Sequence, residues 1–227
     1  MAHRLGLSLA PVLPAALAPV PGPLYGDLLC YKESSLDEER QRAAGHLACL
    51  LRQFLAHHRR CLEDALGGTA QVALAVPSTS RPGPASLERL GHLAELVPGA
   101  LGIPLDWGVD LLRRTGAPIG PMHPNARAFA VPDEYKTQVR QRRVLVLDDS
   151  YVSGARSQSA AAALRLAGAR AVVILPLGRV LRPDRVAAHA EFLQQLAAPS
   201  GHCARCLSGE AGGEVRRLSD QAAAGTG

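Results

Sequence analysis

Two adjacent carboxylates, Asp148 and Asp149, stand directly after a short apolar run and directly before a turn of small and hydroxyl residues. The apolar run, residues 144–147, predicts a strand that is buried on both faces. The turn contains Gly154 and leads into an alanine-rich helical segment. Carboxylates can accept hydrogen bonds from sugar hydroxyls, and turn amides at the positive end of a helix can hold a phosphate. The order of these residues predicts a site for a phosphorylated sugar.

The stretch 144–156, VLVLDDSYVSGAR, resembles the signature with which type I phosphoribosyltransferases bind phosphoribosyl pyrophosphate (PRPP). In that signature an apolar strand, two acids, a short spacer and a hydroxyl/glycine/alanine loop follow one another. Tyr151 stands where the family usually has an aliphatic residue. Val152 and Arg156 stand at positions where the family often has residues with a side-chain hydroxyl. We expect Arg156 to help bind phosphate in place of a hydroxyl. The alternative is an acidic turn of another α/β protein, whose acids only cap the helix.

The resemblance implies a role for each part of the site. Asp148 and Asp149 would hold the two ribose hydroxyls of PRPP, and Mg²⁺ would bridge those hydroxyls and the pyrophosphate. The 5-phosphate would be wrapped by Ser153, Gly154, Ala155, Arg156 and Ser157. The pyrophosphate would meet Ser80, Arg81, Arg113 and Arg114. Arg81 joins the two aspartates as a catalytic candidate, because a charge on the leaving group stabilises the transition state. Ordinary surface charge is the alternative for the three arginines.

Further stretches between Tyr25 and Arg179 follow the order of the ComF branch of this family. They are LLCYK at 28–32, the strand and Val-Pro turn ending at 81, LGIP at 101–104, LRRT at 112–115 and RAF at 127–129. After the turn, PGPASLERL replaces a basic element typical of the branch. The resemblance implies transfer of a phosphoribosyl group to a nitrogenous acceptor with release of pyrophosphate. The replaced element keeps an alternative open, a non-catalytic PRPP- or nucleotide-sensing protein in regulation or DNA uptake.

Composition narrows the class of protein. The 227 residues, 47% hydrophobic and 20% charged, suffice for one α/β domain with an appended piece. A net charge of +5 favours an anionic ligand, and nucleic acid stays open as a partner although no long basic run is present. The scattered cysteines do not suggest a disulfide framework, so we expect a reducing cytoplasm. The oligomeric state is left open.

Two other segments raise questions of targeting and metal binding. The apolar segment 5–20 is interrupted by prolines, so we expect an extended segment and no membrane span, with a secretory signal as the alternative. Cys203 and Cys206, with His202 beside them and His189 upstream, suggest half of a zinc site. Two free thiols are the alternative there.

Strands and helices alternate along the chain, which predicts an α/β fold with a mostly parallel sheet flanked by helices. The resemblance adds a type I phosphoribosyltransferase-like arrangement with a small hood. The expected strands are 72–76, 109–112, 144–147 and 171–175, and the expected helices are 37–66, 87–96, 157–166 and 183–197. We expect an extended N-terminal segment over 1–24, a phosphoribosyltransferase-like domain over 25–198 and a flexible cysteine-containing tail over 199–227. Ligands of parallel sheets lie beyond the carboxyl ends of the strands, where residues 148–156 and 77–83 would meet.

Overall fold

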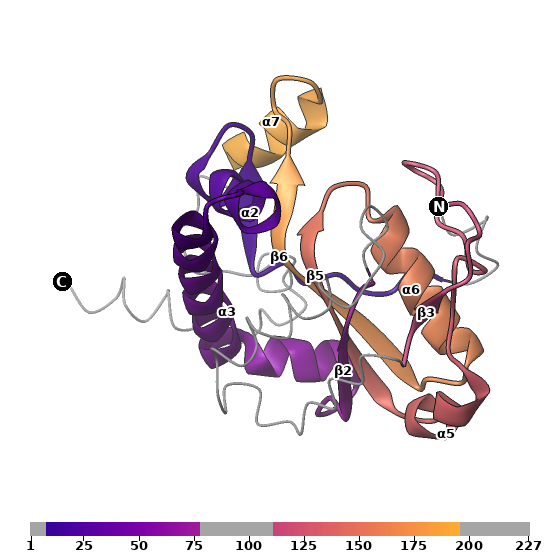
Figure 1. Ribbon diagram of the computed structural model, residues 1–227. Helices are drawn as coiled ribbons and strands as arrows, with labels where there is room; N and C mark the ends of the chain where they lie inside the picture. Colours follow the sequence, from indigo (N-terminus) through magenta and orange to yellow (C-terminus); the bar gives the residue numbers. More distant parts are fainter. Residues whose placement is uncertain (1–7, 78–110, 196–227) are drawn as a thin grey trace.

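The computed structural model describes residues 8–77 and 111–195, which form an α/β fold around a four-stranded sheet (Figure 1). Every neighbouring pair of strands in this sheet is parallel. The strands lie side by side in the order β1 (Ala16–Pro19), β6 (Ala171–Leu181), β5 (Arg143–Tyr151) and β2 (Val72–Ala75). The expected mostly parallel sheet flanked by helices is therefore confirmed.

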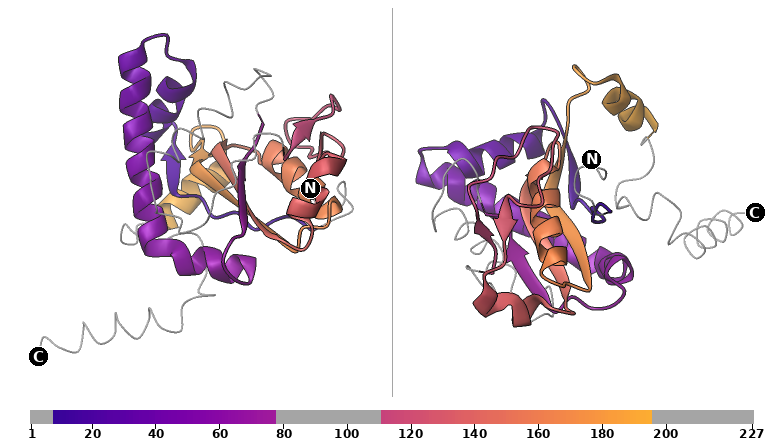
Figure 2. Two further views of the ribbon diagram at one scale, coloured as in Figure 1. Left: turned by 60° about the horizontal axis from the view of Figure 1, so that its bottom comes forward. Right: turned by 90° about the vertical axis from the view of Figure 1, so that its right-hand side faces the viewer.

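Helices cover both faces of the sheet (Figures 1 and 2). One face carries α2 (Pro23–Glu33) and α3 (Asp37–Leu66), and the other carries α6 (Ala155–Leu166). Consecutive residues of a strand point to opposite faces. In β5, Leu145 and Leu147 accordingly pack in the cluster with α3, while Val144 and Val146 pack in the cluster with α6. Burial on both faces explains why this strand is an unbroken apolar run.

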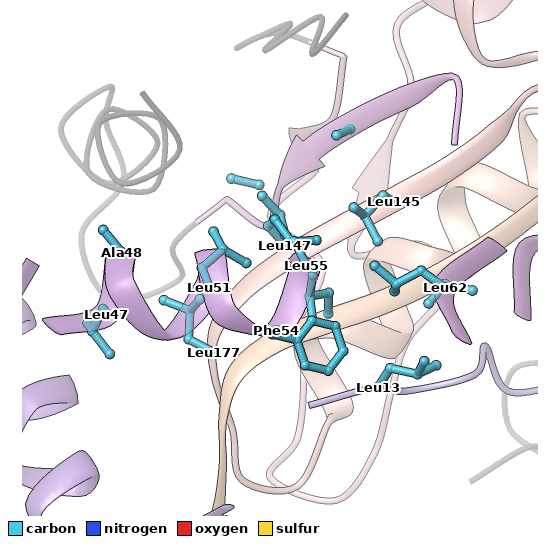
Figure 3. Packing of buried hydrophobic residues seen from close by; sticks show 14 of the residues in the cluster. Leu13, Leu47, Ala48, Leu51, Phe54, Leu55, Leu62, Leu145, Leu147 and Leu177 are labelled. Carbon is cyan, nitrogen blue, oxygen red and sulfur yellow. The ribbon is translucent and has the colours of Figure 1, made fainter. Parts of the chain in front are cut away.

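The helix α3 has the bounds that its periodicity predicts. It ends at Gly67, whose left-handed conformation (φ 67°, ψ 37°) is typical of a glycine that closes a helix. At His58 the backbone leaves the helical conformation (φ −121°, ψ 17°), and Figure 1 shows the two halves of α3 running in different directions. Figure 3 shows Leu51 and Leu55 of α3 close to Leu147 of β5. The bent helix thus contributes apolar side chains to one core along much of its length.

The N-terminal segment joins the sheet. Leu13 N–H donates to the Ile174 carbonyl, and Ile174 N–H donates to the Pro11 carbonyl, both at 2.9 Å. The buried side chain of Gln158 in α6 holds the backbone of Ala10 through two hydrogen bonds of 2.9 and 3.0 Å. Residues 16–19 then pair with β6 as the edge strand β1. Within the predicted 1–24 segment, Val12 and residues 16–19 therefore pair with the sheet.

Several elements differ from their predicted bounds. The central strands extend beyond their apolar runs, because β6 continues as LPLGRVL and β5 stays paired with it as far as Tyr151. Of the strand predicted over 109–112, residues 109 and 110 lie outside the described residues. Leu111 and Leu112 are buried but belong to no strand, and β3 begins after them at Arg113. The helix expected over 87–96 lies outside the described residues. The remaining elements are β3 (Arg113–Arg114), antiparallel to β4 (Phe129–Ala130), the 3-10 helix η1 (Asp133–Tyr135), α5 (Lys136–Val139) and α7 (Ala187–Gln195).

Among residues 8–77 and 111–195, no helix has both the length and the apolar character that crossing a membrane requires.

Two leucines near the end of α6 provide a test of this packing. Leu164 is 0% exposed and Leu166 is 65% exposed. Leu164→Ala should lower the free energy of unfolding by about 2–5 kcal/mol, because it removes a buried side chain and leaves a cavity. Leu166→Ala, the matched control on the same helix, should change it by less than about 0.5 kcal/mol. Urea denaturation measures both, and equal changes would contradict the burial of α6 against the sheet.

Candidate functional site

The acid pair lies inside β5 near the carboxyl end of the sheet, and its first member is a buried, fully engaged carboxylate. Asp148 is 2% exposed and opposite Pro176 of β6. Arg156 Nη2 lies 2.6 Å from its Oδ1, and Ser157 Oγ donates to its Oδ2 at 2.5 Å. Both partners stand in the first turn of α6. Asp148 therefore joins the central strand to the helix on one face of the sheet.

The second acid has its main partner on a different element. Lys32 Nζ, from the last turn of α2, lies 2.8 Å from Asp149 Oδ1 and donates to Ser150 Oγ at 2.9 Å. The Ser150 backbone N–H and hydroxyl donate to the same Oδ1 at 2.5 and 3.1 Å, and Arg156 Nη2 lies 3.4 Å from it. Among the described residues, no hydrogen bond reaches Oδ2. The Asp149 side chain is 16% exposed, so this oxygen is the open acceptor of the pair.

The two carboxyl groups differ in electrostatics as well. Burial raises the pKa of Asp148, and the negative charge of Asp149 raises it further, although Arg156 and Ser157 act against this. Burial alone would also raise the pKa of Asp149. There the charges of Lys32 and Arg156 and the hydrogen bonds from Lys32 and Ser150 outweigh burial, so the pKa lies below its usual value. Asp149 is accordingly held in its ionised form, and the pKa of Arg156 is raised, chiefly by Asp148.

A tight turn connects the acids with α6. Gly154 has φ 75° and ψ 0°, and a Cβ at this position would overlap the ring of Tyr151. The ring of Tyr151 is thus packed into the space that the glycine leaves. On the neighbouring strand, the Arg179 guanidinium lies 4.9 Å from the centroid of the same ring. Beyond the turn, the first backbone N–H groups of α6 have no partner within the helix, as at every helix start.

The side chains of the predicted phosphate-binding residues make contacts within the protein, either inside the turn or with Asp148. Ser153 Oγ accepts a hydrogen bond of 3.4 Å from the Ala155 N–H, within the turn. The side chains of Arg156 and Ser157, which were expected to wrap a phosphate, bind Asp148 in this structure. The backbone N–H groups of the turn and of the first helical residues are therefore the remaining candidates for binding a phosphate.

The arginines expected at the pyrophosphate lie on a separate small sheet or outside the described residues. Arg113 Nη1, on β3, lies 3.4 Å from Glu134 Oε1, and the guanidinium is 5.9 Å from the Tyr135 ring centroid. Arg114 follows it on the same strand. Ser80 and Arg81 are outside the described residues.

The zinc hypothesis concerns residues that are mostly not described, since Cys203 and Cys206 lie beyond residue 195. His189 Nδ1 accepts a hydrogen bond of 3.0 Å from the Arg182 N–H. In the described part of the chain, no group of three histidine, cysteine or acidic side chains is arranged to hold a metal ion.

The fold and this cluster define an α/β protein with charged groups at the carboxyl end of a parallel sheet. Comparison with protein-family models and with curated proteins found no match for this chain. The sequence alone indicated no role for Ser150 or Arg179, and Lys32 was included only as the end of the LLCYK stretch. Their contacts depend on strand and helix packing between distant segments, for which the local sequence contains no signal.

The pairing of Asp148 with Arg156 predicts a large effect on stability. Arg156→Met should lower the free energy of unfolding by about 3–5 kcal/mol, because it leaves a buried carboxylate without its partner. Adding Asp148→Asn to the same chain should recover much of this loss. Arg59→Met, which breaks the exposed pair with Glu63, is the control and should cost less than about 1 kcal/mol. The double-mutant cycle is measured by denaturation, and additive effects would rule out the pairing.

The contact of Gly154 with Tyr151 gives a second prediction for the site. Gly67→Ala places a side chain at a left-handed position with nothing within 4 Å, and should cost about 1 kcal/mol. Gly154→Ala adds the overlap with Tyr151 to the same backbone strain, so its cost should be clearly larger. Thermal unfolding of both variants measures the difference, and equal costs would show that the ring moves aside freely.

Proposed function

We propose that the protein binds PRPP or a nucleotide 5-phosphate at the carboxyl end of β5, as a type I phosphoribosyltransferase-like protein of the ComF branch. The observation that carries the proposal is the open Oδ2 of Asp149, separated by one tight turn from the first turn of α6. Ligands of parallel sheets bind at this edge. A carboxylate and a helix start at such short separation suit the hydroxyls and the 5-phosphate of one sugar.

The two acids have unequal roles in this proposal. Asp149 Oδ2 accepts hydrogen bonds from the ribose hydroxyls. Asp148 is engaged by Arg156 and Ser157, so it acts mainly by holding the start of α6 against β5. The amides of the turn and of the first helical residues, from Ser153 onward, bind the phosphate.

The reaction that we propose is transfer of the phosphoribosyl group to a nitrogenous acceptor, with loss of pyrophosphate. Such a transfer develops positive charge at the anomeric carbon, and the protein contributes by positioning the sugar and stabilising charge. Mg²⁺ would be held mainly by oxygens of the ligand itself, and it would neutralise negative charge on the pyrophosphate leaving group. We also propose that Arg81 binds the pyrophosphate, because of its position in the sequence just after the residues of β2. A cytoplasmic location is part of this proposal.

Calorimetry with PRPP and Mg²⁺, and separately with ribose 5-phosphate, tests the proposal. Both ligands should bind. Asp149→Asn should weaken binding by roughly 10- to 100-fold, because a charged hydrogen bond contributes about 1.5–3 kcal/mol. Asp133→Asn, which changes an exposed acid paired with Lys136, is the control and should bind as wild type does. An absence of binding to either ligand, or unchanged affinity in folded Asp149→Asn, contradicts the proposal.

A second candidate, a PRPP sensor without transfer activity, is favoured by the replacement of the basic element after the Val-Pro turn by PGPASLERL. An assay for pyrophosphate release with purine, pyrimidine and amine acceptors separates the two. Release with any acceptor supports the enzyme. Tight binding of PRPP without release from any of them supports the sensor.

A further inference from the structure

Lys32 reaches the candidate site from a part of the chain far removed from the acids. It stands in the last turn of α2, a helix that packs beside α3, β1 and β6. Its Nζ bridges Asp149 Oδ1 at 2.8 Å and Ser150 Oγ at 2.9 Å. An ammonium group has three N–H donors, so one lysine can make both contacts at once. The Lys32 side chain is 29% exposed, which places this bridge partly out of water.

The bridge determines how the Asp149 carboxylate is turned. Lys32 Nζ and both donors of Ser150 meet Oδ1, with the Arg156 guanidinium at 3.4 Å. A carboxylate held by several donors on one oxygen has little freedom to rotate. Its other oxygen, Oδ2, receives none of the hydrogen bonds among the described residues, and it therefore keeps a defined direction.

We propose that Lys32 is a positioning residue, which orients Asp149 so that Oδ2 is presented to the vicinal hydroxyls of a ribose 5-phosphate ester. This inference rests on the proposed function and names the residue on which the acceptor depends. Lys32 itself need not touch the ligand.

The surrounding charges support a special role for Lys32. Asp149 is faced by Lys32 from α2, by Arg156 from α6 and by Asp148 within β5. Arg156 lies closer to Asp148, at 2.6 Å, than to Asp149, at 3.4 Å. Lys32 is consequently the main counter-charge of Asp149. Without it, the pKa of Asp149 would rise, because only Arg156 and Ser150 would then act against the effect of burial. A protonated carboxyl group accepts hydrogen bonds more weakly than a carboxylate.

A purely structural role for Lys32, as a contact that joins α2 to β5, predicts different behaviour of the Lys32 variants. If the contact were only structural, replacing Lys32 would lower the stability of the fold. It would leave the Asp149 pKa and the pH dependence of ligand affinity in the folded protein unchanged. The test therefore needs a measurement that follows this carboxyl group directly and a measurement that follows the ligand.

The experiment compares Lys32→Met and Lys32→Arg with the control Lys136→Met, which removes an exposed lysine paired with Asp133. Affinity for ribose 5-phosphate is measured by calorimetry at several values between about pH 5 and pH 8. In the ratio of mutant to wild-type affinity, the pH dependence that comes from the ligand's own phosphate cancels. In parallel, the Asp149 carboxyl group is titrated by carbon-13 NMR in protein without ligand.

We expect Lys32→Met to weaken binding roughly tenfold near neutral pH, and more as the pH falls, because its Asp149 becomes protonated at a higher pH than in wild type. Lys32→Arg should recover most of the affinity, and Lys136→Met should behave as wild type. The carboxyl titration should show a raised Asp149 pKa in Lys32→Met only.

Three results would decide against the inference or separate it from the proposed function. An unchanged Asp149 titration in folded Lys32→Met overturns the positioning role. So does a constant affinity ratio across the pH range, which fits a purely structural contact. If wild-type protein binds neither ribose 5-phosphate nor PRPP, the proposed function fails, and the carboxyl titration alone then decides whether Lys32 sets the state of Asp149.

Discussion

The buried pair of Asp148 and Arg156 is the constraint on which the carboxyl edge of the sheet depends. A carboxylate at 2% exposure is costly unless it is paired and hydrogen-bonded, and here both its side-chain partners stand in the first turn of α6. The pairing sets where α6 begins over β5. The chain between them must then close in a tight turn, which Gly154 permits through its left-handed conformation.

Adjacent acids on one strand serve opposite layers of the fold. Asp148 binds the α6 side and Asp149 binds Lys32 from α2, so the central strand is joined to helices on both faces at one level. This division makes the acids chemically unequal, with one fully engaged and the other retaining an open oxygen. A shift in either helix layer would change the site.

The sequence predicted those features that depend on local periodicity. The bounds of α3 and the starts of β2 and β6 follow from apolar spacing and from closing glycines. The edge strand β1 was missed because prolines interrupt its segment, although an edge strand tolerates them. The partners of the acids could not be predicted, because the contact of Lys32 with Asp149 is formed by packing between segments about half the chain apart.

The position of β1 has a consequence for the way the molecule is made. Its only strand partner among the described residues is β6, where Ala16 lies opposite Gly178. During synthesis from the N-terminus, this edge of the sheet cannot form until nearly all of the described chain has left the ribosome. Contacts between segments so far apart slow folding, because the long loop must close before they are gained. Among the strands that the structure describes, the first to be synthesised is therefore one of the last to be paired.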